Sequence, residues 1–404
     1  MNETKQMNKL DYGNAPNRIL YFMVAKLSYI FLKIKYRIKI DNSSLKNMKA
    51  PYIVLANHPS ALDPFILTAT MYPHKVNILG TNHYFRIPIL RPLLKLAGIV
   101  PKVQAYKDTR AVRMMNKVIA IGGILVIYPE GRRSTDGSQY TISDSIAKLI
   151  KLYKVPVAAV VSNGAYLSKP RWTSFPHRGC IEVNTKEVLS AEQIKELSIE
   201  KIHSAVCSSI YYNDYQWNRI KKVSFKHKKI AENIHNILHQ CPGCGKEKAM
   251  RSNKNRLYCK FCGNAALMDE YGFLNPEAES SVIFEDAVKW LKWQREKAKA
   301  TVQAIDFSIV SKVVKLTRAD AFTGPYRNAG HGTAALTNEG LTFNGIVDSK
   351  PQEMFFPMSV MYSISSEFGS NFEITDGKNT YCFFLEDGQD VARIELAVHT
   401  NNIE

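Results

Sequence analysis

The sequence predicts a layered α/β domain, followed by a compact cysteine module and a small antiparallel β domain. In the first half, short apolar runs typical of buried strands alternate with helical stretches, which favours a layered α/β sheet. Two C-x-x-C pairs then follow, at residues 241–244 and 259–262. Beyond residue 305, short β-rich runs alternate with turn signals such as Asn338-Glu339-Gly340, which favours antiparallel strands.

These changes along the chain set the expected domain boundaries. In order, we expect an N-terminal helical region (1–40), the α/β domain (41–235), the cysteine module (241–264), a linker helix (280–304) and the β domain (305–400). The strands expected in and beside the α/β domain are residues 35–40, 52–56, 76–80, 124–128, 157–161 and, at an edge, 181–183.

The N-terminal helix is expected to lie in a membrane interface. Residues 19–34 are strongly apolar but shorter than the roughly 20 residues that a spanning helix needs. Lys26 and Lys33 fall on one narrow side of this helix, where they could reach lipid headgroups. A packing helix of the core and a spanning helix are the alternatives.

The formal net charge of +18 belongs to the first part of the chain. Residues 1–240 carry 36 Lys and Arg against 15 Asp and Glu, whereas residues 241–404 carry 18 against 21. The first part should therefore be drawn to phospholipid headgroups, an acidic carrier, phosphorylated substrates or nucleic acid. The seven cysteines and the polar N-terminus, which does not have the pattern of a secretion signal, suggest a reducing compartment.

His58 and Asp63 are the first candidate catalytic residues. They follow the expected buried strand 52–56 in the sequence Asn57-His58-Pro59-Ser60-Ala61-Leu62-Asp63. A spacing of five is not one helical face, so the pair must meet through a turn that enters a helix, where Pro59 fits a first turn. The carboxylate could then hold one ring nitrogen and leave the other free to accept a proton. The alternative is a surface histidine beside a helix-capping aspartate.

A candidate anion site follows the expected strand 124–128. The sequence there is Pro129-Glu130-Gly131-Arg132-Arg133-Ser134. A glycine beside two arginines can hold phosphate, because backbone amides approach closely and guanidinium groups bind oxygens in pairs. Glu130 could orient an arginine or bind a substrate hydroxyl. The alternative is a basic turn with a solvated salt bridge.

These blocks resemble the motifs of the glycerolipid acyltransferases, the family of 1-acylglycerol-3-phosphate acyltransferases. Asn57, His58, Ser60 and Asp63 match N-H-x-S-x-x-D, the H-x4-D motif. The block at 128–134 matches F-P-E-G-T-R-S, with Tyr128 as the aromatic residue and Arg132 in place of Thr, and residues 155–160 match V-P-I-V-P-V in part. The resemblance covers about residues 20–220 and implies the layered acyltransferase-type fold.

The poorest match is at Gly98-Ile99-Val100-Pro101-Lys102-Val103-Gln104. It follows G-x-I-P-x-x-R until its end, where Gln104 stands for an arginine that helps to hold the substrate phosphate in the family. Lys102 or Arg132 could compensate for this arginine, as could Lys107 or Arg110. The departure concerns the identity of the acceptor more than the reaction.

The resemblance implies a mechanism and its partners. His58, oriented by Asp63, would be the general base on the hydroxyl of a lysophospholipid, with lysophosphatidate as the leading acceptor and phosphatidate as the product. The acyl donor would be an acyl-CoA or acyl-carrier-protein thioester. Glu130, Gly131 and Arg133 would bind the acceptor's phosphate and glycerol. The protein would work in phospholipid biosynthesis at the cytoplasmic face of a membrane, as a peripheral or monotopic enzyme.

The cysteine module is expected to be a zinc ribbon. Cys241, Cys244, Cys259 and Cys262 form two knuckles that supply four thiolates for a structural zinc ion, and a redox pair of C-x-x-C motifs is the alternative. The ribbon would serve as a stapled linker or a partner-docking module. The last domain faintly resembles the β-rich modules of the pleckstrin-homology and GRAM type.

Two rival functions stay open from the sequence. The first is a non-catalytic regulatory protein, in which the α/β part binds lipid and the ribbon binds a partner. The second is a zinc-ribbon protein that binds nucleic acid, since the ribbon segment is itself basic. The second is disfavoured, because the larger basic surface belongs to the enzyme-like part.

Overall fold

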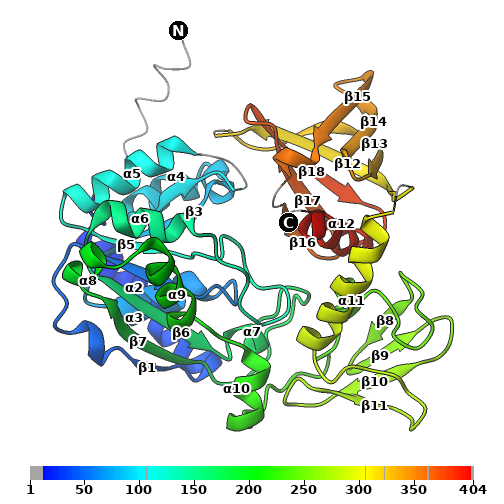
Figure 1. Ribbon diagram of the computed structural model, residues 1–404, viewed down its shortest axis with the longest axis horizontal. Coiled ribbons are helices and arrows are strands. Elements are labelled where there is room, and N and C mark those ends of the chain that lie inside the picture. Colours follow the sequence, from blue (N-terminus) through cyan, green and yellow to red (C-terminus); the bar gives the residue numbers. More distant parts are fainter. Residues whose placement is uncertain (1–11, 105–107, 305, 323, 362–363, 402–404) are drawn as a thin grey trace.

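The computed structural model describes residues 12–104, 108–304, 306–322, 324–361 and 364–401. The chain forms an N-terminal α/β part, a small four-stranded sheet in the middle, and a second seven-stranded sheet at the C-terminal end (Figure 1). Helix α11 (Ala287–Val302) leads from the middle part to the C-terminal part.

The N-terminal sheet has the strand order β1-β7-β6-β2-β5-β3-β4. Its strands are β1 (Lys39–Asp41), β2 (Tyr52–Ala56), β3 (Val76–Thr81), β4 (Val100–Lys102), β5 (Ile124–Ile127), β6 (Val157–Asn163) and β7 (Glu182–Leu189). Neighbouring strands run parallel, except that β6 and β7 are antiparallel. Strand β2 lies at the centre and all five of its residues are buried, as its unbroken apolar sequence requires. The loops that follow β2, β3, β4, β5 and β6 therefore meet at one edge of the sheet, where α/β sheets bind ligands.

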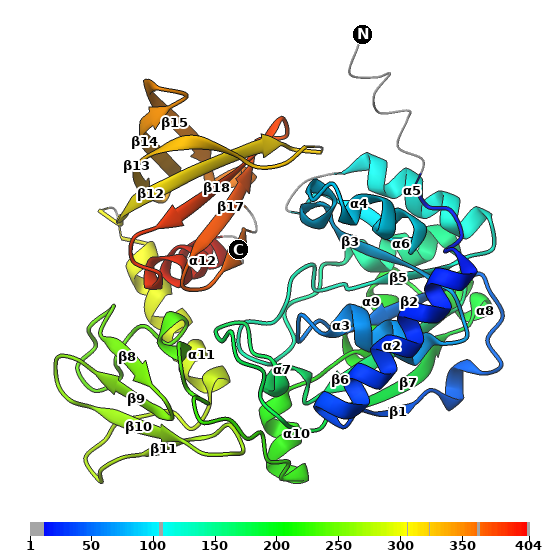
Figure 2. The ribbon, with the colours of Figure 1, turned by 180° about the vertical axis from the view of Figure 1, so that it is seen from behind.

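Helices cover both faces of this sheet. The helices of the N-terminal part are α2 (Arg18–Tyr36), α3 (Asp63–Met71), α4 (Leu90–Leu96), α5 (Thr109–Ala120), α6 (Ser145–Tyr153), α7 (Ala165–Ser168), α8 (Ala191–Glu196), α9 (Ile199–Ser209) and α10 (Asp214–Lys221), with short 3-10 turns η1 (Ser43–Leu45) and η2 (Asn82–Arg86). The 3-10 turn η3 (Ile234–Asn236) follows and packs into the core of the middle part. Helices α2 and α3 lie on one face (Figure 2). Helices α5, α6 and α9 pack into the core on the other.

The strand expected at residues 35–40 is wrong in its first half. Helix α2 continues through Tyr36, and the chain leaves it at Arg37, which has a φ of 48°. Strand β1 contains only Lys39–Asp41. Leu32 and Tyr36 continue the buried stripe of the helix, and burial of this stripe outweighs the polar–apolar alternation that resembles a strand. The strand expected at 181–183 is also longer, because β7 runs to Leu189 and β1, not β7, forms the edge.

The middle and C-terminal parts are both antiparallel. The middle sheet contains β8 (Met250–Asn253), β9 (Arg256–Cys259), β10 (Ala265–Met268) and β11 (Leu274–Pro276), so it extends past the expected boundary at 264. The C-terminal sheet has the order β15-β14-β13-β12-β18-β17-β16. Its elements are β12 (Ile309–Asp320), β13 (Arg327–Leu336), β14 (Gly340–Val347), β15 (Lys350–Pro357), the turn η4 (Met358–Val360), β16 (Ser365–Glu367), β17 (Asn371–Thr375), β18 (Asn379–Leu385) and helix α12 (Gln389–Asn401). In the part of the chain described here, no helix combines the length and apolar character that crossing a bilayer requires.

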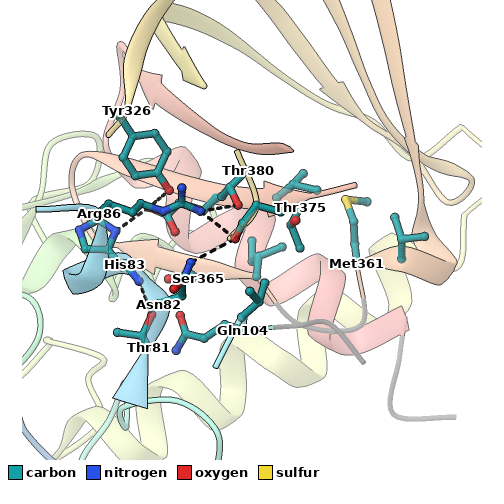
Figure 3. A pocket seen from close by; sticks show the side chains of 16 residues that line it. Thr81, Asn82, His83, Arg86, Gln104, Tyr326, Met361, Ser365, Thr375 and Thr380 are labelled. Carbon is teal, nitrogen blue, oxygen red and sulfur yellow. Dashed lines mark hydrogen bonds and ion pairs between the residues drawn. The ribbon is translucent and has the colours of Figure 1, made fainter. Parts of the chain in front are cut away.

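The C-terminal part contacts the N-terminal sheet at the edge where its parallel strands end. Arg86, just after β3, donates from Nη2 to the carbonyl oxygen of Ala321 at 3.1 Å and to Oγ1 of Thr380 at 3.0 Å. Asn82 donates from Nδ2 to the same carbonyl at 3.2 Å. Figure 3 shows Arg86 and Asn82 reaching across to this part of the molecule. The segment that follows β3 at this edge is therefore bound to the C-terminal domain.

Candidate active site

The structure brings His58 and Asp63 together at the end of the central strand. Nδ1 of His58 lies 2.7 Å from Oδ2 of Asp63, which also accepts the backbone N–H of Ser60 at 3.0 Å. Asp63 is the first residue of α3, and the turn between β2 and this helix closes the spacing of five. With the carboxylate ionised, Nδ1 carries the hydrogen of this bond and Nε2 keeps its lone pair. Among the described residues none hydrogen-bonds to Nε2, and the His58 side chain is 20% exposed.

Burial and charge act in opposite directions on Asp63. Its side chain is 3% exposed. Burial raises the pKa of its carboxyl group, and the hydrogen bond from His58 and the positive charge of Arg133 lower it by less, so the pKa is raised overall. The ring of His58 stacks on the ring of Tyr128, with centroids 4.3 Å apart and planes 24° apart. The carboxylate and the aromatic ring together fix the orientation of the imidazole. The pair can therefore accept a proton at a defined position.

Asn57 and Ser60 position the His58 loop. Asn57 donates from Nδ2 to the carbonyl oxygen of Ser162 at 2.9 Å and accepts the N–H of the same residue at 2.9 Å. The hydroxyl of Ser60 donates to the carbonyl oxygen of Lys169 at 3.3 Å. Both side chains are buried. Their polar atoms therefore bind strand β6 and the loop that follows α7, and they hold His58 at the sheet edge.

Glu130 joins the His58 loop to the loop after β5. Its Oε1 accepts the backbone N–H of His58 at 2.9 Å, and its Oε2 accepts the N–H of Tyr140 at 2.9 Å and the hydroxyl of Tyr212 at 3.4 Å. Burial raises the pKa of Glu130 to about 8, against the effect of the two N–H donors. Both carboxyl oxygens are thus engaged within the protein, where they fix the backbone that carries the imidazole.

The two arginines after Gly131 point to different partners. Gly131 has a φ of 68°, a conformation that favours glycine, and no atom lies within 4 Å of where a Cβ would be. Arg132 is buried and pairs with Glu395 of helix α12. Arg133 pairs with Glu367 at the end of strand β16, with Nη2 and Oε1 2.6 Å apart and side-chain exposures of 24% and 59%. Both carboxylates come from the C-terminal part.

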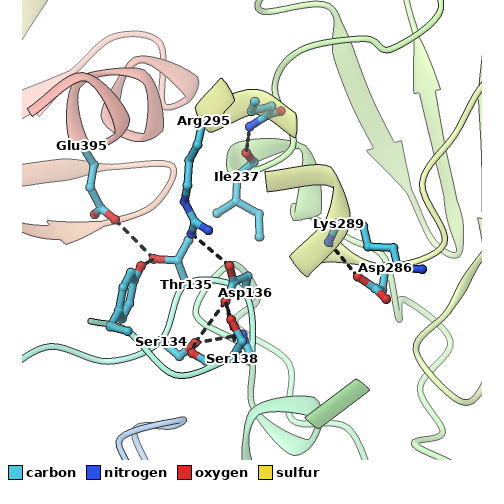
Figure 4. Close-up of polar contacts among 12 residues, drawn as sticks. Ser134, Thr135, Asp136, Ser138, Ile237, Asp286, Lys289, Arg295 and Glu395 are labelled. Carbon is cyan, nitrogen blue, oxygen red and sulfur yellow. Dashed lines mark hydrogen bonds and ion pairs between the residues drawn. The ribbon is translucent and has the colours of Figure 1, made fainter. Parts of the chain in front are cut away.

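A third arginine, which the sequence did not single out, joins this group. Arg171 donates from Nη1 to the carbonyl oxygen of Arg133 at 3.1 Å, and its Nη2 reaches Ser366, the residue before Glu367. Figure 4 shows Glu395 reaching down to Thr135, beside Asp136, which binds Arg295 of helix α11. No local motif marks Arg171, Glu367 or Glu395, because they meet only through the fold.

Lys102 and Gln104 lie at the next strand end. Burial lowers the pKa of Lys102, and its ammonium donates to the carbonyl oxygen of Val103 at 3.3 Å. Gln104 lines a pocket between the two parts, where Ser365 and Thr380 form part of the opposite wall (Figure 3). The position at which the motif would carry an arginine therefore borders the C-terminal domain, in a pocket that is also lined by Arg86, whose guanidinium binds Ala321 and Thr380 of that domain.

Comparison with known proteins identifies the N-terminal part. A family model described as Acyltransferase matches residues 37–163. Residues 37–163 are thus similar to the acyltransferase family. The matched segment contains strands β1 to β6 and the candidate residues of the loops after β2 and β5, including His58, Asp63 and Glu130. It confirms the resemblance that the motifs at residues 57–63 and 128–134 predict.

Two relatives add detail to this acyltransferase domain. The 1-acyl-sn-glycerol-3-phosphate acyltransferase of Saccharomyces cerevisiae is 26% identical over 181 residues, which are 43% of this chain and 59% of the yeast protein. The chain thus spans a little more than half the length of this curated relative. The crystal structure of the 1-acyl-sn-glycerophosphate (LPA) acyltransferase PlsC from Thermotoga maritima aligns with 50% of this chain and 79% of that chain, at 18% identity and a TM-score of 0.42.

The cysteine quartet beyond the acyltransferase domain has the geometry of a metal site. The sulfur atoms of Cys241, Cys244, Cys259 and Cys262 all lie within 4.8 Å of one another. The Cys241–Cys262 and Cys244–Cys259 sulfur distances are 3.6 and 3.8 Å. Four thiolates at about 2.3 Å from a tetrahedral zinc ion would be about 3.8 Å apart, so the residues fit this metal. The side-chain amide of Asn264 donates to the sulfur of Cys241 and the backbone N–H of Phe261 to the sulfur of Cys259, and such hydrogen bonds orient the ligands of metal sites.

Helix α2 gives the acyltransferase domain an apolar surface. Its buried residues Tyr21, Ala25, Leu32 and Tyr36 face the sheet. Large apolar side chains on its outer face are exposed: Ile19, Phe22, Met23, Leu27, Tyr29, Ile30, Phe31 and Ile34. Neighbouring Phe65 of α3 continues this surface through its contact with Phe31. Contiguous exposed apolar surface of this kind is typical of an interaction site.

Proposed function

We propose that the protein is a membrane-associated O-acyltransferase that moves a fatty acyl group from a thioester to the hydroxyl of a lysophospholipid. The observation that carries the proposal is the 2.7 Å contact between His58 and Asp63, which leaves Nε2 of His58 available at the edge of the sheet. The acceptor is lysophosphatidate and the product phosphatidate. The donor is an acyl-CoA or an acyl-carrier protein.

In this mechanism Nε2 of His58 takes the proton of the acceptor hydroxyl. The oxygen then attacks the thioester carbonyl, the new ester C–O bond forms and the C–S bond breaks. The protonated imidazole, stabilised by Asp63, returns its proton to the leaving thiolate. The reaction needs no acyl-enzyme, so the cysteines have no nucleophilic role. Arg133 supplies the charge that binds the acceptor phosphate.

The proposed site of action is the cytoplasmic face of a membrane. The exposed apolar side of α2 would enter the lipid interface, and Lys33 and Lys35 in its last turn would face headgroups. The four ribbon cysteines would hold a structural zinc ion, which supplies cross-linking and no catalytic group. The last domain, predicted to be of the pleckstrin-homology or GRAM type, would bind Arg132 and Arg133 through its carboxylates.

A transfer assay tests the proposal directly. Purified protein is given lysophosphatidate, glycerol 3-phosphate and neutral lysolipids, each with acyl-CoA and with acyl-carrier protein. Transfer to lysophosphatidate is expected, and His58→Ala should reduce it by about 100- to 10,000-fold. His74→Ala, a histidine outside the site, serves as the matched control. Wild-type turnover in His58→Ala would overturn the mechanism. Lipid binding without transfer to any acceptor would favour a non-catalytic regulatory protein.

A further inference from the structure

Strand β16 places one carboxylate directly on the motif arginine. Oε1 of Glu367 lies 2.6 Å from Nη2 of Arg133. The preceding residue, Ser366, is fixed from two sides, because its backbone and hydroxyl bind Arg171 and its hydroxyl also binds Glu395. Glu367 is therefore presented to Arg133 by an anchored strand end.

A second cation lies beside this contact. Lys169 follows α7, and its carbonyl oxygen accepts the hydroxyl of Ser60 in the His58 loop. Its ammonium donates to the carbonyl oxygen of Thr173 at 2.7 Å and keeps further donors. Burial and then the charge of Arg133 lower the pKa of Lys169, whereas the charge of Glu367 raises it. The charges of Lys169, Arg133 and Glu367 thus act on one another, and the backbone of Lys169 contacts the loop that carries the candidate base.

We propose that Arg133 and Lys169 form the binding site for the acceptor's phosphate, and that the carboxylate of Glu367 occupies this site until phosphate displaces it. The inference rests on the proposed function for the identity of the anion. It assigns to Lys169 the role of second cation that the motif would give to residue 104. Arg132 cannot serve in this arrangement, because its buried guanidinium is paired with Glu395.

The two arginine–glutamate pairs differ in how much of their side chains is exposed to solvent. Glu367 is 59% exposed and Arg133 24% exposed, whereas Arg132 and Glu395 are 11% and 6% exposed. A partly exposed pair between two side chains is weak, so a phosphate with more charge and more acceptor oxygens can replace the carboxylate. The buried pair can meanwhile hold the two domains together. Replacement of the Glu367 carboxylate by phosphate at Arg133 requires only the side chain of Glu367 to move.

The first test measures binding of inorganic phosphate by calorimetry. Glu367→Gln should bind phosphate about two- to fivefold more tightly than the wild type, because the internal competitor loses its charge. Lys169→Met should bind it about three- to tenfold more weakly. Glu353→Gln, an exposed glutamate of strand β15 in the same domain, should leave binding unchanged. Equal phosphate affinity in Glu367→Gln and the wild type would overturn the inference, whatever the behaviour of the lysine variant.

The second test uses steady-state kinetics to identify the phosphate. In Glu367→Gln the KM for lysophosphatidate should fall by the same factor, with kcat and the donor KM unchanged. The KM of Glu367→Gln for monoacylglycerol, which has no phosphate, should equal that of the wild type. A change in the acyl-CoA KM alone would overturn the assignment to the acceptor. Tighter phosphate binding in Glu367→Gln with no acyl transfer to any acceptor would support the anion site and refute the proposed function. Normal acyl transfer with unchanged phosphate affinity would support the proposed function and refute the anion site.

Discussion

The guanidinium group of Arg132 is buried against the carboxylate of Glu395, a residue 263 positions further along the chain. Burial raises the pKa of Glu395, but the charges of Arg132 and Arg171 outweigh burial, so the pKa is lowered overall. The carboxylate is therefore ionised in the folded protein at neutral pH. This pair joins the strand-end motif of the acyltransferase domain to the last helix.

Removing one partner of this pair should be strongly destabilising. Glu395→Ala leaves the charge of Arg132 buried without compensation, which typically costs about 3–5 kcal/mol of unfolding free energy. Urea denaturation measures this cost, and Glu339→Ala, at an exposed turn of the same domain, serves as the control. The double variant Arg132→Met/Glu395→Met should recover part of the loss. A Glu395→Ala protein within about 0.5 kcal/mol of the wild type would contradict the interdomain role.

Asp63→Asn should lower kcat while the protein stays folded. The amide keeps the shape of the carboxylate but cannot stabilise a protonated imidazole, and it can reverse the tautomer of His58. We expect kcat to fall by about 100- to 10,000-fold, with a smaller change in KM. Asp144→Asn, at an exposed helix start, should have wild-type kinetics. An Asp63→Asn enzyme with normal kcat would show that this carboxylate does not assist the base.

The buried carboxyl of Glu130 should make stability depend on pH. Its pKa is about 8 in the folded protein and near the ordinary value of 4.5 for a glutamate in the unfolded chain, so between these values the native state holds a proton that the unfolded state lacks. The unfolding free energy should therefore decrease as pH rises from about 5 to 8, at up to about 1.4 kcal/mol per pH unit. Urea denaturation across this range should show a flatter slope for Glu130→Gln than for the wild type or Glu187→Gln. Parallel slopes in all three proteins would contradict the raised pKa.

The ribbon should contain about one zinc ion per chain. Changing all four of its cysteines to serine should abolish zinc binding and lower the melting temperature, because the middle sheet depends on the cross-link. Elemental analysis and thermal unfolding measure the two effects. Cys207→Ser, outside the ribbon, should retain the metal. Stoichiometric zinc in the quadruple variant would rule out this site.

The outer face of α2 should control membrane binding. Leu27 and Ile34 are 66% and 69% exposed, so Leu27→Glu/Ile34→Glu should leave the core intact. Each leucine or isoleucine that enters lipid contributes about 1.5–3 kcal/mol, so we expect at least a tenfold loss of binding to phospholipid vesicles in sedimentation. Ile220→Glu, which changes an 81% exposed isoleucine of α10, is the control. Equal partitioning of the double variant and the wild type would place the membrane contact elsewhere.

Local signals in the sequence account for four central strands, the His58–Asp63 pair and the four cysteines. Apolar runs of strand length mark β2, β3, β5 and β6, and recognisable motif spacings mark the His58–Asp63 pair and the two C-x-x-C knuckles. The sequence does not predict the helical continuation to Tyr36, because the alternation at residues 35–40 is typical of a strand and only the burial of Tyr36 against the sheet favours the helix. The pairing of Arg132 with Glu395 and of Arg133 with Glu367 depends on the packing of two domains, which no local pattern records.

The buried position of Arg86, Arg132 and Arg171 bears on any truncated form of the protein. All three guanidinium groups have contacts with the C-terminal domain, so cutting the chain after the acyltransferase domain would remove these partners and expose the groups to water. The fragment would present a newly cationic edge on an already basic domain. Such a surface attracts nucleic acid and anionic lipid indiscriminately. Ligand affinities measured on the fragment would therefore reflect the newly exposed arginines and not the intact protein. Ligands should be screened against the full chain.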